Sequence, residues 1–114
     1  MVGIDGSPGA GKTTLAGSLA GLDEAIEVVG LDAFGLPQAA LPDAPAETAV
    51  DWRRFRTQVL LLLSRDLPGL VPPAREVPVG GIVLVEGQGA LIKQLATFYD
   101  FRIWVEAPDH VRRA

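Results

Sequence analysis

Short apolar stretches alternate with helical patterns along this chain. Four stretches rich in β-branched residues are apolar almost throughout, which is typical of strands buried on both faces of a parallel sheet. These stretches are residues 1–4, 26–31, 82–85 and 101–105. Between them, apolar residues recur at helical spacing, in the sets Leu15, Leu19 and Leu22, then Trp52, Phe55, Val59 and Leu62, then Leu91, Leu95 and Phe98. The alternation predicts right-handed βαβ crossovers and an α/β fold with a mostly parallel sheet flanked by helices.

Capping and breaking residues mark the ends of these elements. Asp51 is a good N-cap for the second helix, and the Leu-Pro-Gly at 67–69 favours its end. Pro108 suits the first position of a last helix. The Pro- and Ala-rich residues 36–49 and the residues 70–81 are predicted to be loops.

The composition limits the classes of function. A length of 114 residues fits one domain, expected to span residues 1–114, and a hydrophobic content of 48% excludes a chain that is disordered throughout. The chain has no cysteine and one histidine, which excludes thiolate zinc sites, cysteine nucleophiles and sites built from several histidines. That histidine, His110, is expected to be a surface residue without a functional role.

Charge and hydropathy limit the kinds of partner that the protein can bind. The net charge is −4 and no Lys/Arg-rich run occurs, which argues against nonspecific nucleic-acid binding. The aliphatic run at 59–63 is far shorter than the ~20 residues of a membrane span. The N-terminus also lacks the pattern of a signal peptide. We therefore expect a cytoplasmic protein without a membrane partner.

The strongest motif lies between the first predicted strand and the first predicted helix. Residues 6–13 match the spacing G-x-x-x-x-G-K-[ST] of a phosphate loop, and the glycine spacing does not fit the G-x-G-x-x-G dinucleotide fingerprint. Backbone N–H groups of such a loop turn toward phosphate oxygens, Lys12 supplies an ammonium for the β- and γ-phosphates, and the Thr13 hydroxyl can ligate Mg²⁺. The predicted nucleotide-binding residues are Gly6, Ser7, Pro8, Gly9, Ala10, Gly11, Lys12, Thr13 and Thr14.

Two carboxylates directly follow predicted strands. Glu86 ends the third strand, at the edge where open α/β sheets bind their ligands, and is a candidate metal-binding residue. The alternative for Glu86 is a solvated strand-end glutamate. Asp32 follows the second strand and is a candidate acceptor of the proton of an attacking hydroxyl, while a turn-forming role fits its position equally well. Phe34 is expected to form an apolar wall for an acceptor ring.

Five segments together resemble one family of kinases. They are GIDGSPGAGKTTLA at 3–16, VVGLDAF at 28–34, DWRRF at 51–55, IVLVEGQGAL at 82–91 and FRIWVEAP at 101–108. In residues and order they resemble the uridine kinase-like branch of the P-loop kinases, which includes pantothenate and phosphoribulose kinases. The resemblance covers nearly the whole chain and implies the three-layer P-loop NTPase-type fold.

The same resemblance implies a reaction and its participants. It implies transfer of the γ-phosphoryl group of ATP, with Mg²⁺, to a hydroxyl of a small molecule such as uridine or cytidine. Asp32 would then be the acceptor-side base, and Glu86 would organise Mg²⁺ together with Thr13. Lys12 would belong to the nucleotide clamp and take part in catalysis.

Two departures from the family pattern concern the acceptor and the lid. Family members carry a Tyr and an Arg in an acceptor-binding segment, whereas residues 70–75 of this chain contain no tyrosine. Family members also continue through an arginine-bearing lid helix, a further strand and an adenine-contacting loop, so this chain is expected to be truncated in its C-terminal part. Arg112 and Arg113 are either the start of such a lid or the solvated face of a helix.

Three functions stay open at this point. An ATP-dependent small-molecule kinase is favoured. The alternative is a nucleotide-binding module without turnover, either a fragment or a degenerate relative. A hydrolytic NTPase ranks last because no water-positioning residue is identifiable. A homo-oligomer is compatible with the sequence.

Overall fold

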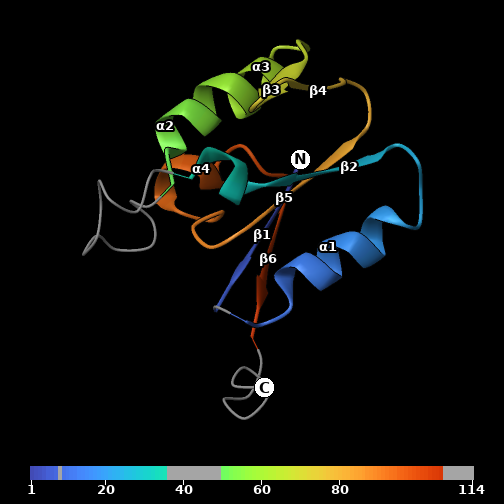
Figure 1. The fold of residues 1–114 in the computed structure, drawn as a ribbon, viewed down its shortest axis with the longest axis vertical. Coiled ribbons are helices and arrows are strands. Elements are labelled where there is room, and N and C mark those ends of the chain that lie inside the picture. The colour runs from blue at the N-terminus through green and yellow to red at the C-terminus, as the bar shows by residue number, and fades with distance from the viewer. Residues whose placement is uncertain (8, 36–49, 107–114) are drawn as a thin grey trace.

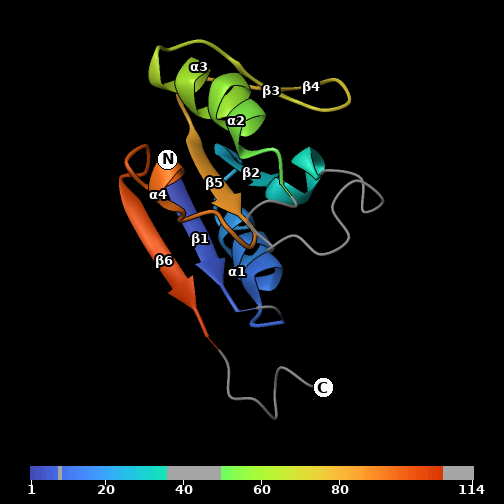
Figure 2. The ribbon, with the colours of Figure 1, turned by 90° about the vertical axis from the view of Figure 1, so that its left-hand side faces the viewer.

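Four parallel strands form the central sheet of the protein (Figure 1). The computed structural model describes residues 1–7, 9–35 and 50–106. The strands are β1 (Val2–Gly6), β2 (Ile26–Gly30), β5 (Ile82–Glu86) and β6 (Phe101–Val105). They lie in the order β2-β5-β1-β6, and the arrowheads of β1, β5 and β6 point the same way in Figure 2. All four predicted strands and the parallel sheet are therefore confirmed.

Helical segments connect these strands. They are α1 (Lys12–Ala20), the 3-10 turn η1 (Leu31–Phe34), α2 (Trp52–Phe55), the π-helical segment η4 (Arg56–Leu61), α3 (Leu62–Ser64) and α4 (Lys93–Ala96). The segments α2, η4 and α3 follow one another without a break. The Asp51 carboxylate accepts a hydrogen bond from the Arg54 backbone N–H at 3.2 Å, which confirms Asp51 as the predicted N-cap.

Several predictions concern residues outside the described part of the chain. They are the phosphate-loop residue Pro8, the loop over 36–49, the helix expected from Pro108, and the roles of His110, Arg112 and Arg113.

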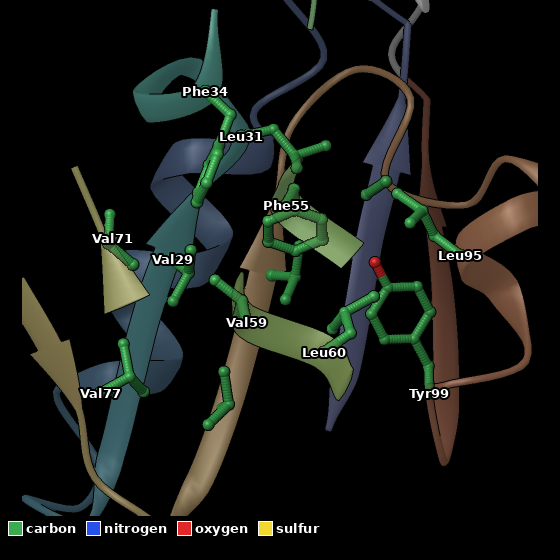
Figure 3. Close-up of a cluster of buried hydrophobic side chains, with 13 residues drawn as sticks. Val29, Leu31, Phe34, Phe55, Val59, Leu60, Val71, Val77, Leu95 and Tyr99 are labelled. Carbon is green, nitrogen blue, oxygen red and sulfur yellow. The ribbon is translucent and has the colours of Figure 1, made fainter. Parts of the chain in front are cut away.

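An apolar cluster packs between the sheet and the continuous stretch from α2 to α3 (Figure 3). Along β5, Val83 and Val85 belong to this cluster, whereas Leu84 is buried on the opposite face because strand side chains alternate. On that opposite face, α1 packs against β1, β2 and β5. The central strands β1 and β5 are covered on both faces, which explains their apolar character. The edge strand β6 is not covered in this way, and its Phe101 and Trp104 are exposed.

The predicted loop over 70–81 is wrong in its first half. A short antiparallel hairpin occupies it, formed by β3 (Gly69–Val71) and β4 (Arg75–Val77). Val71 and Val77 pack into the apolar cluster. Arg75 fastens the hairpin to β2, donating to the Val28 carbonyl at 2.8 Å and to the Glu27 carboxylate at 2.7 Å. Burial of two valines and this anchor hold a hairpin that is too short to be stable alone.

The predicted apolar face of the first helix is only partly correct. Leu15 and Leu19 are half-buried, but Leu22 is 78% exposed because α1 ends at Ala20, before it reaches this position. The fully buried residue of α1 is Ala16 instead. A small side chain there lets the helix axis approach the sheet closely.

The helix predicted over 91–98 is shorter in the structure, where α4 spans Lys93–Ala96. Leu95 is buried as the pattern indicated. Leu91, however, lies in the preceding loop, where its backbone N–H donates to the Asp5 carboxylate at 3.0 Å. This bond to a distant side chain fixes the loop and delays the start of the helix.

None of the helices within the described residues is long and apolar enough to cross a membrane.

Candidate active site

The candidate site lies where the strands end. β1 leads into the phosphate loop and α1, β2 leads into η1, and β5 leads into the loop over 87–92. In a parallel sheet, all these connections leave from the same edge, which is where open α/β sheets bind ligands.

The phosphate loop has the backbone that its glycines allow. Gly9 and Gly11 have φ angles of 74° and 98°, a region that residues with a Cβ rarely adopt. Gly11 is the N-cap of α1, so the positive end of the helix dipole faces the loop. The Lys12 ammonium lies over the loop and donates to the Gly6 carbonyl at 2.8 Å and to the Ser7 carbonyl at 3.4 Å. Lys12 therefore already stands beside the place where phosphates would bind.

One cavity of about 360 Å³ brings together four of the predicted site residues. Lys12 and Thr13 come from α1, Asp32 from η1, and Glu86 from the end of β5. Thr14 lies on the exposed first turn of α1 and does not line the cavity. The remaining lining residues are Leu31, Val50, Gly87 and Gln88.

Asp32 and Glu86 converge above Gly30. A Cβ atom built on Gly30 would lie 2.6 Å from an Asp32 carboxylate oxygen and 3.2 Å from a Glu86 carboxylate oxygen. Both acids thus reach the same point, and they can do so because residue 30 has no side chain. Sequence reasoning placed the two acids at one edge but did not identify this glycine.

The oxygen atoms in the cavity suit a hard divalent cation. The Thr13 hydroxyl donates to a Glu86 carboxylate oxygen at 3.2 Å, so the two predicted metal-binding residues are in contact. Within the described ranges, no group of three or more His, Cys, Asp or Glu side chains forms a metal cluster. This donor set fits Mg²⁺, which commonly takes one or two carboxylates and completes its shell with phosphate oxygens and water.

Asp32 lines the cavity and does not cap the turn in which it lies. In η1 the N-cap is Gly30, and no side chain caps this turn. The Asp32 side chain is exposed and lines the cavity. Its position fits a role in the site better than a role in forming the turn.

Phe34 does not form the expected wall. Its side chain is 2% exposed and meets the Phe55 ring edge-on, with the ring centroids 5.3 Å apart. The prediction is wrong because the edge-on packing of two aromatic rings in the core draws Phe34 inward.

Asp5 is a buried charge that sequence reasoning missed. It lies on β1 one residue before the phosphate loop and is 5% exposed. The neighbouring Tyr99 hydroxyl is buried and has no hydrogen-bond partner in the described part of the chain. Burial of the ring, and then the negative charge of Asp5, raise the pKa of Tyr99 well above its usual value. The signal in the sequence was an aspartate inside an otherwise apolar strand.

A second cavity of about 460 Å³ lies between the helical stretch and the hairpin. Arg54 and Gln58 line it from one side and Arg75 and Glu76 from the other. The Arg54 guanidinium lies 5.8 Å from the centre of the Phe34 ring, and its Nε donates to Gln58 at 3.3 Å.

No protein-family model and no curated protein matches this chain. It is similar to the solved structure of a candidate fructose transport system kinase from Silicibacter sp. TM1040, with 24% identity and a TM-score of 0.71 over 97% of this chain and 66% of that chain. It is also similar to that of a candidate uridine kinase from Bacillus stearothermophilus, with 23% identity and a TM-score of 0.73 over 97% of this chain and 72% of that chain.

The two likenesses bear on the predicted fold. This chain spans 66% of the length of the first neighbour and 72% of the length of the second. Both neighbours have P-loop kinase-like folds. Together with the observed parallel sheet and phosphate loop, they confirm the predicted three-layer architecture. The described part of this chain has the α/β fold of the P-loop kinases.

Proposed function

We propose that this chain is a P-loop kinase-like unit that transfers the γ-phosphoryl group of ATP to a hydroxyl of a small molecule. The observation that carries the proposal is the convergence of Lys12, Thr13, Asp32 and Glu86 on one cavity beside the phosphate loop. We further propose that residues 1–114 act as one domain in the cytoplasm, in keeping with the absence of cysteine.

Each side chain has a distinct part in this reaction. The phosphate loop and the Lys12 ammonium bind the phosphates and offset the charge that develops during transfer. Asp32 accepts the proton of the acceptor hydroxyl as its oxygen forms a bond to the γ-phosphorus. The bond from the γ-phosphorus to the bridging oxygen breaks, and ADP leaves. The products are ADP and the phosphorylated acceptor.

Thr13 and Glu86 would hold Mg²⁺ in this reaction. The ion, when bound, neutralises phosphate charge. The contact between the Thr13 hydroxyl and the Glu86 carboxylate at 3.2 Å supports this assignment, because both oxygens already face one point of the cavity.

The acceptor is proposed to be a nucleoside or a similar small molecule. The resemblance of the sequence to uridine kinase-like enzymes favours a nucleoside such as uridine or cytidine. The part of the acceptor that does not react would occupy the second cavity, whose Arg54, Gln58 and Glu76 offer both donors and acceptors. In this proposal the reacting hydroxyl lies at Asp32 and the rest of the acceptor extends toward the hairpin.

A panel of acceptors tests the proposed function. The full chain is incubated with Mg-ATP and with nucleosides, pantothenate or sugars, and ADP release is measured for each. At least one nucleoside is expected to raise ADP release clearly above the rate without acceptor. ATP binding without ADP release for any acceptor would instead support the alternative of a binding module without turnover. No binding of ATP at all would contradict both functions.

Arg54 offers a test of the acceptor cavity. We expect Arg54→Ala to raise KM for the acceptor about tenfold, which corresponds to the loss of about 1.4 kcal/mol, a typical value for a hydrogen bond to a charged group. The value of kcat should stay within about twofold, because Arg54 does not line the cavity of the reacting groups. Steady-state kinetics with the best acceptor of the panel measure both constants.

The neighbouring Arg53 provides the matched control. Its guanidinium lies 5.0 Å from the centre of the Trp52 ring, and Arg53 does not line the second cavity. Arg53→Ala removes the same charge from the same helix and should leave KM unchanged. An equal rise in KM for both variants would show that the positive charge of the helix, and not a contact in the cavity, affects acceptor binding. It would contradict the proposal that the second cavity holds the acceptor.

A further inference from the structure

Asp5 is held by parts of the chain that are far apart in the sequence. Within the described ranges, it is the one charged side chain that is buried. One carboxylate oxygen accepts from the Gly6 N–H at 2.7 Å and from the Gly89 N–H at 3.2 Å. The other accepts from the Leu91 N–H at 3.0 Å. Both oxygens therefore accept hydrogen bonds from backbone donors.

These donors belong to the two loops that border the candidate site. Gly6 opens the phosphate loop, whereas Gly89 and Leu91 lie in the loop over 87–92 that follows Glu86. Gly87 and Gln88 of this second loop line the cavity. The Asp5 carboxylate is thus a shared anchor for both walls of the site.

Because the Asp5 carboxylate is buried, breaking its hydrogen bonds to the two loops is costly. Removing a charge from water is costly unless hydrogen bonds replace the lost hydration, and bonds to an ionised acceptor are stronger than bonds between neutral groups. If the 87–92 loop moved away, one oxygen of Asp5 would lose its sole donor and the other would lose one of two. The loop is therefore held against β1.

We propose that Asp5 is a positioning residue that fastens the 87–92 loop to the phosphate loop and thereby keeps Glu86 beside Thr13. The proposal rests on the proposed function where it concerns nucleotide and metal, but the clamp itself is a property of the chain without ligands. Glu86 is the last residue of β5, so its carboxylate depends on where the following loop runs. Asp5 sits outside the cavity and acts through this loop.

Asp5→Asn weakens the clamp selectively at Leu91. An amide group of the same size carries one acceptor oxygen and one NH₂ group, which is a donor. With its oxygen toward Gly6 and Gly89, it retains those two bonds and turns the NH₂ group toward the Leu91 N–H. The bond from Leu91, one of the two that link Asp5 to the second loop, is lost, while the bonds from Gly6 and Gly89 survive.

Amide hydrogen exchange of the full chain without ligands tests the clamp. By NMR, the Leu91 amide of Asp5→Asn is expected to exchange about tenfold faster than that of the unchanged protein, after correction for any change in global stability. The matched control is Tyr99→Phe, which alters a buried group beside Asp5 but removes no bond formed within the described residues. It should leave this exchange within about twofold. A Leu91 amide that is equally protected in Asp5→Asn would overturn the proposal.

Nucleotide affinity tests the consequence for the site. Calorimetric titration with ADP is carried out with Mg²⁺ and with EDTA. In Asp5→Asn, the gain in affinity that Mg²⁺ provides is expected to fall about tenfold, with metal-free affinity changed by less than about twofold. Equal losses with and without Mg²⁺, or no loss, would overturn the link to Glu86. If the unchanged protein binds no ADP, the proposed function fails, while the exchange experiment still decides whether the clamp exists.

A second variant covers the case in which Asp5→Asn does not fold. Gly89 has a φ of 94°, so Gly89→Ala strains the same loop without altering Asp5. It should likewise reduce the gain in ADP affinity that Mg²⁺ provides. An unchanged gain in this folded variant would overturn the proposal as well.

Discussion

Asp32→Asn is expected to lower kcat for acceptor phosphorylation by about 10³-fold, or about 4 kcal/mol in activation free energy. The amide keeps the size of the side chain but cannot accept the proton of the attacking hydroxyl. Affinity for ADP should stay within about twofold, because the phosphates are bound by the loop and by Lys12. Single-turnover rates with the best acceptor, together with ADP titration, separate the two effects.

Asp23 gives the matched control for this experiment. Its carboxylate accepts from the Ala25 N–H at 2.8 Å in the turn before β2, and Asp23 does not line the cavity. Asp23→Asn makes the same chemical change and preserves an acceptor for that turn, so both rate and affinity should be unchanged. A rate in Asp32→Asn above a third of the original would show that Asp32 is not the proton acceptor.

Local patterns made much of the site predictable from the sequence. The phosphate loop is specified within one short segment, since its glycines, Lys12 and Thr13 must follow one another in the chain. Asp32 and Glu86 were predictable in two steps. Each lies at the end of an apolar strand, and parallel strands end at the same edge of the sheet. The observed cavity, which both acids line, agrees with that geometry.

The features that the sequence did not predict depend on contacts over long distances. Asp5 is bonded to N–H groups 84 and 86 residues away, and no local pattern encodes such a pairing. The hairpin consists of two strands of three residues each, too short for an alternation to be recognised. Phe34 was assigned to the site by its position after Asp32, but packing against Phe55 decides where its ring lies.

Gly30 lies beneath the Asp32 and Glu86 carboxylates, and we expect its replacement to have the second large effect on activity. Its backbone is extended, with φ −86° and ψ 132°, a conformation that any residue adopts, so Gly30→Ala adds no backbone strain. The new methyl group would, however, lie 2.6 Å from Asp32 and 3.2 Å from Glu86. The Asp32 carboxylate must move to make room for it, and the Glu86 carboxylate must give way by a few tenths of an ångström.

This displacement should lower kcat by up to about 10²-fold, a loss that a misplacement of reacting groups by about 1 Å can cause. The gain in ADP affinity provided by Mg²⁺ should fall as well, because Glu86 is displaced from Thr13. The midpoint of thermal unfolding should change little, since the displaced groups are the ends of flexible side chains. Kinetics, titration and a melting curve measure the three quantities on the same preparation.

Gly17→Ala is the control that isolates the steric effect at Gly30. A Cβ on Gly17 meets nothing within 4 Å, and the residue lies on an exposed position of α1. The substitution should raise stability by about 1 kcal/mol through helix propensity and leave kcat unchanged. Full activity in Gly30→Ala would show that Asp32 and Glu86 need not converge during the reaction. A loss confined to Gly30→Ala would show that the missing side chain at residue 30 lets Asp32 of η1 and Glu86 of β5 reach the same point of the site.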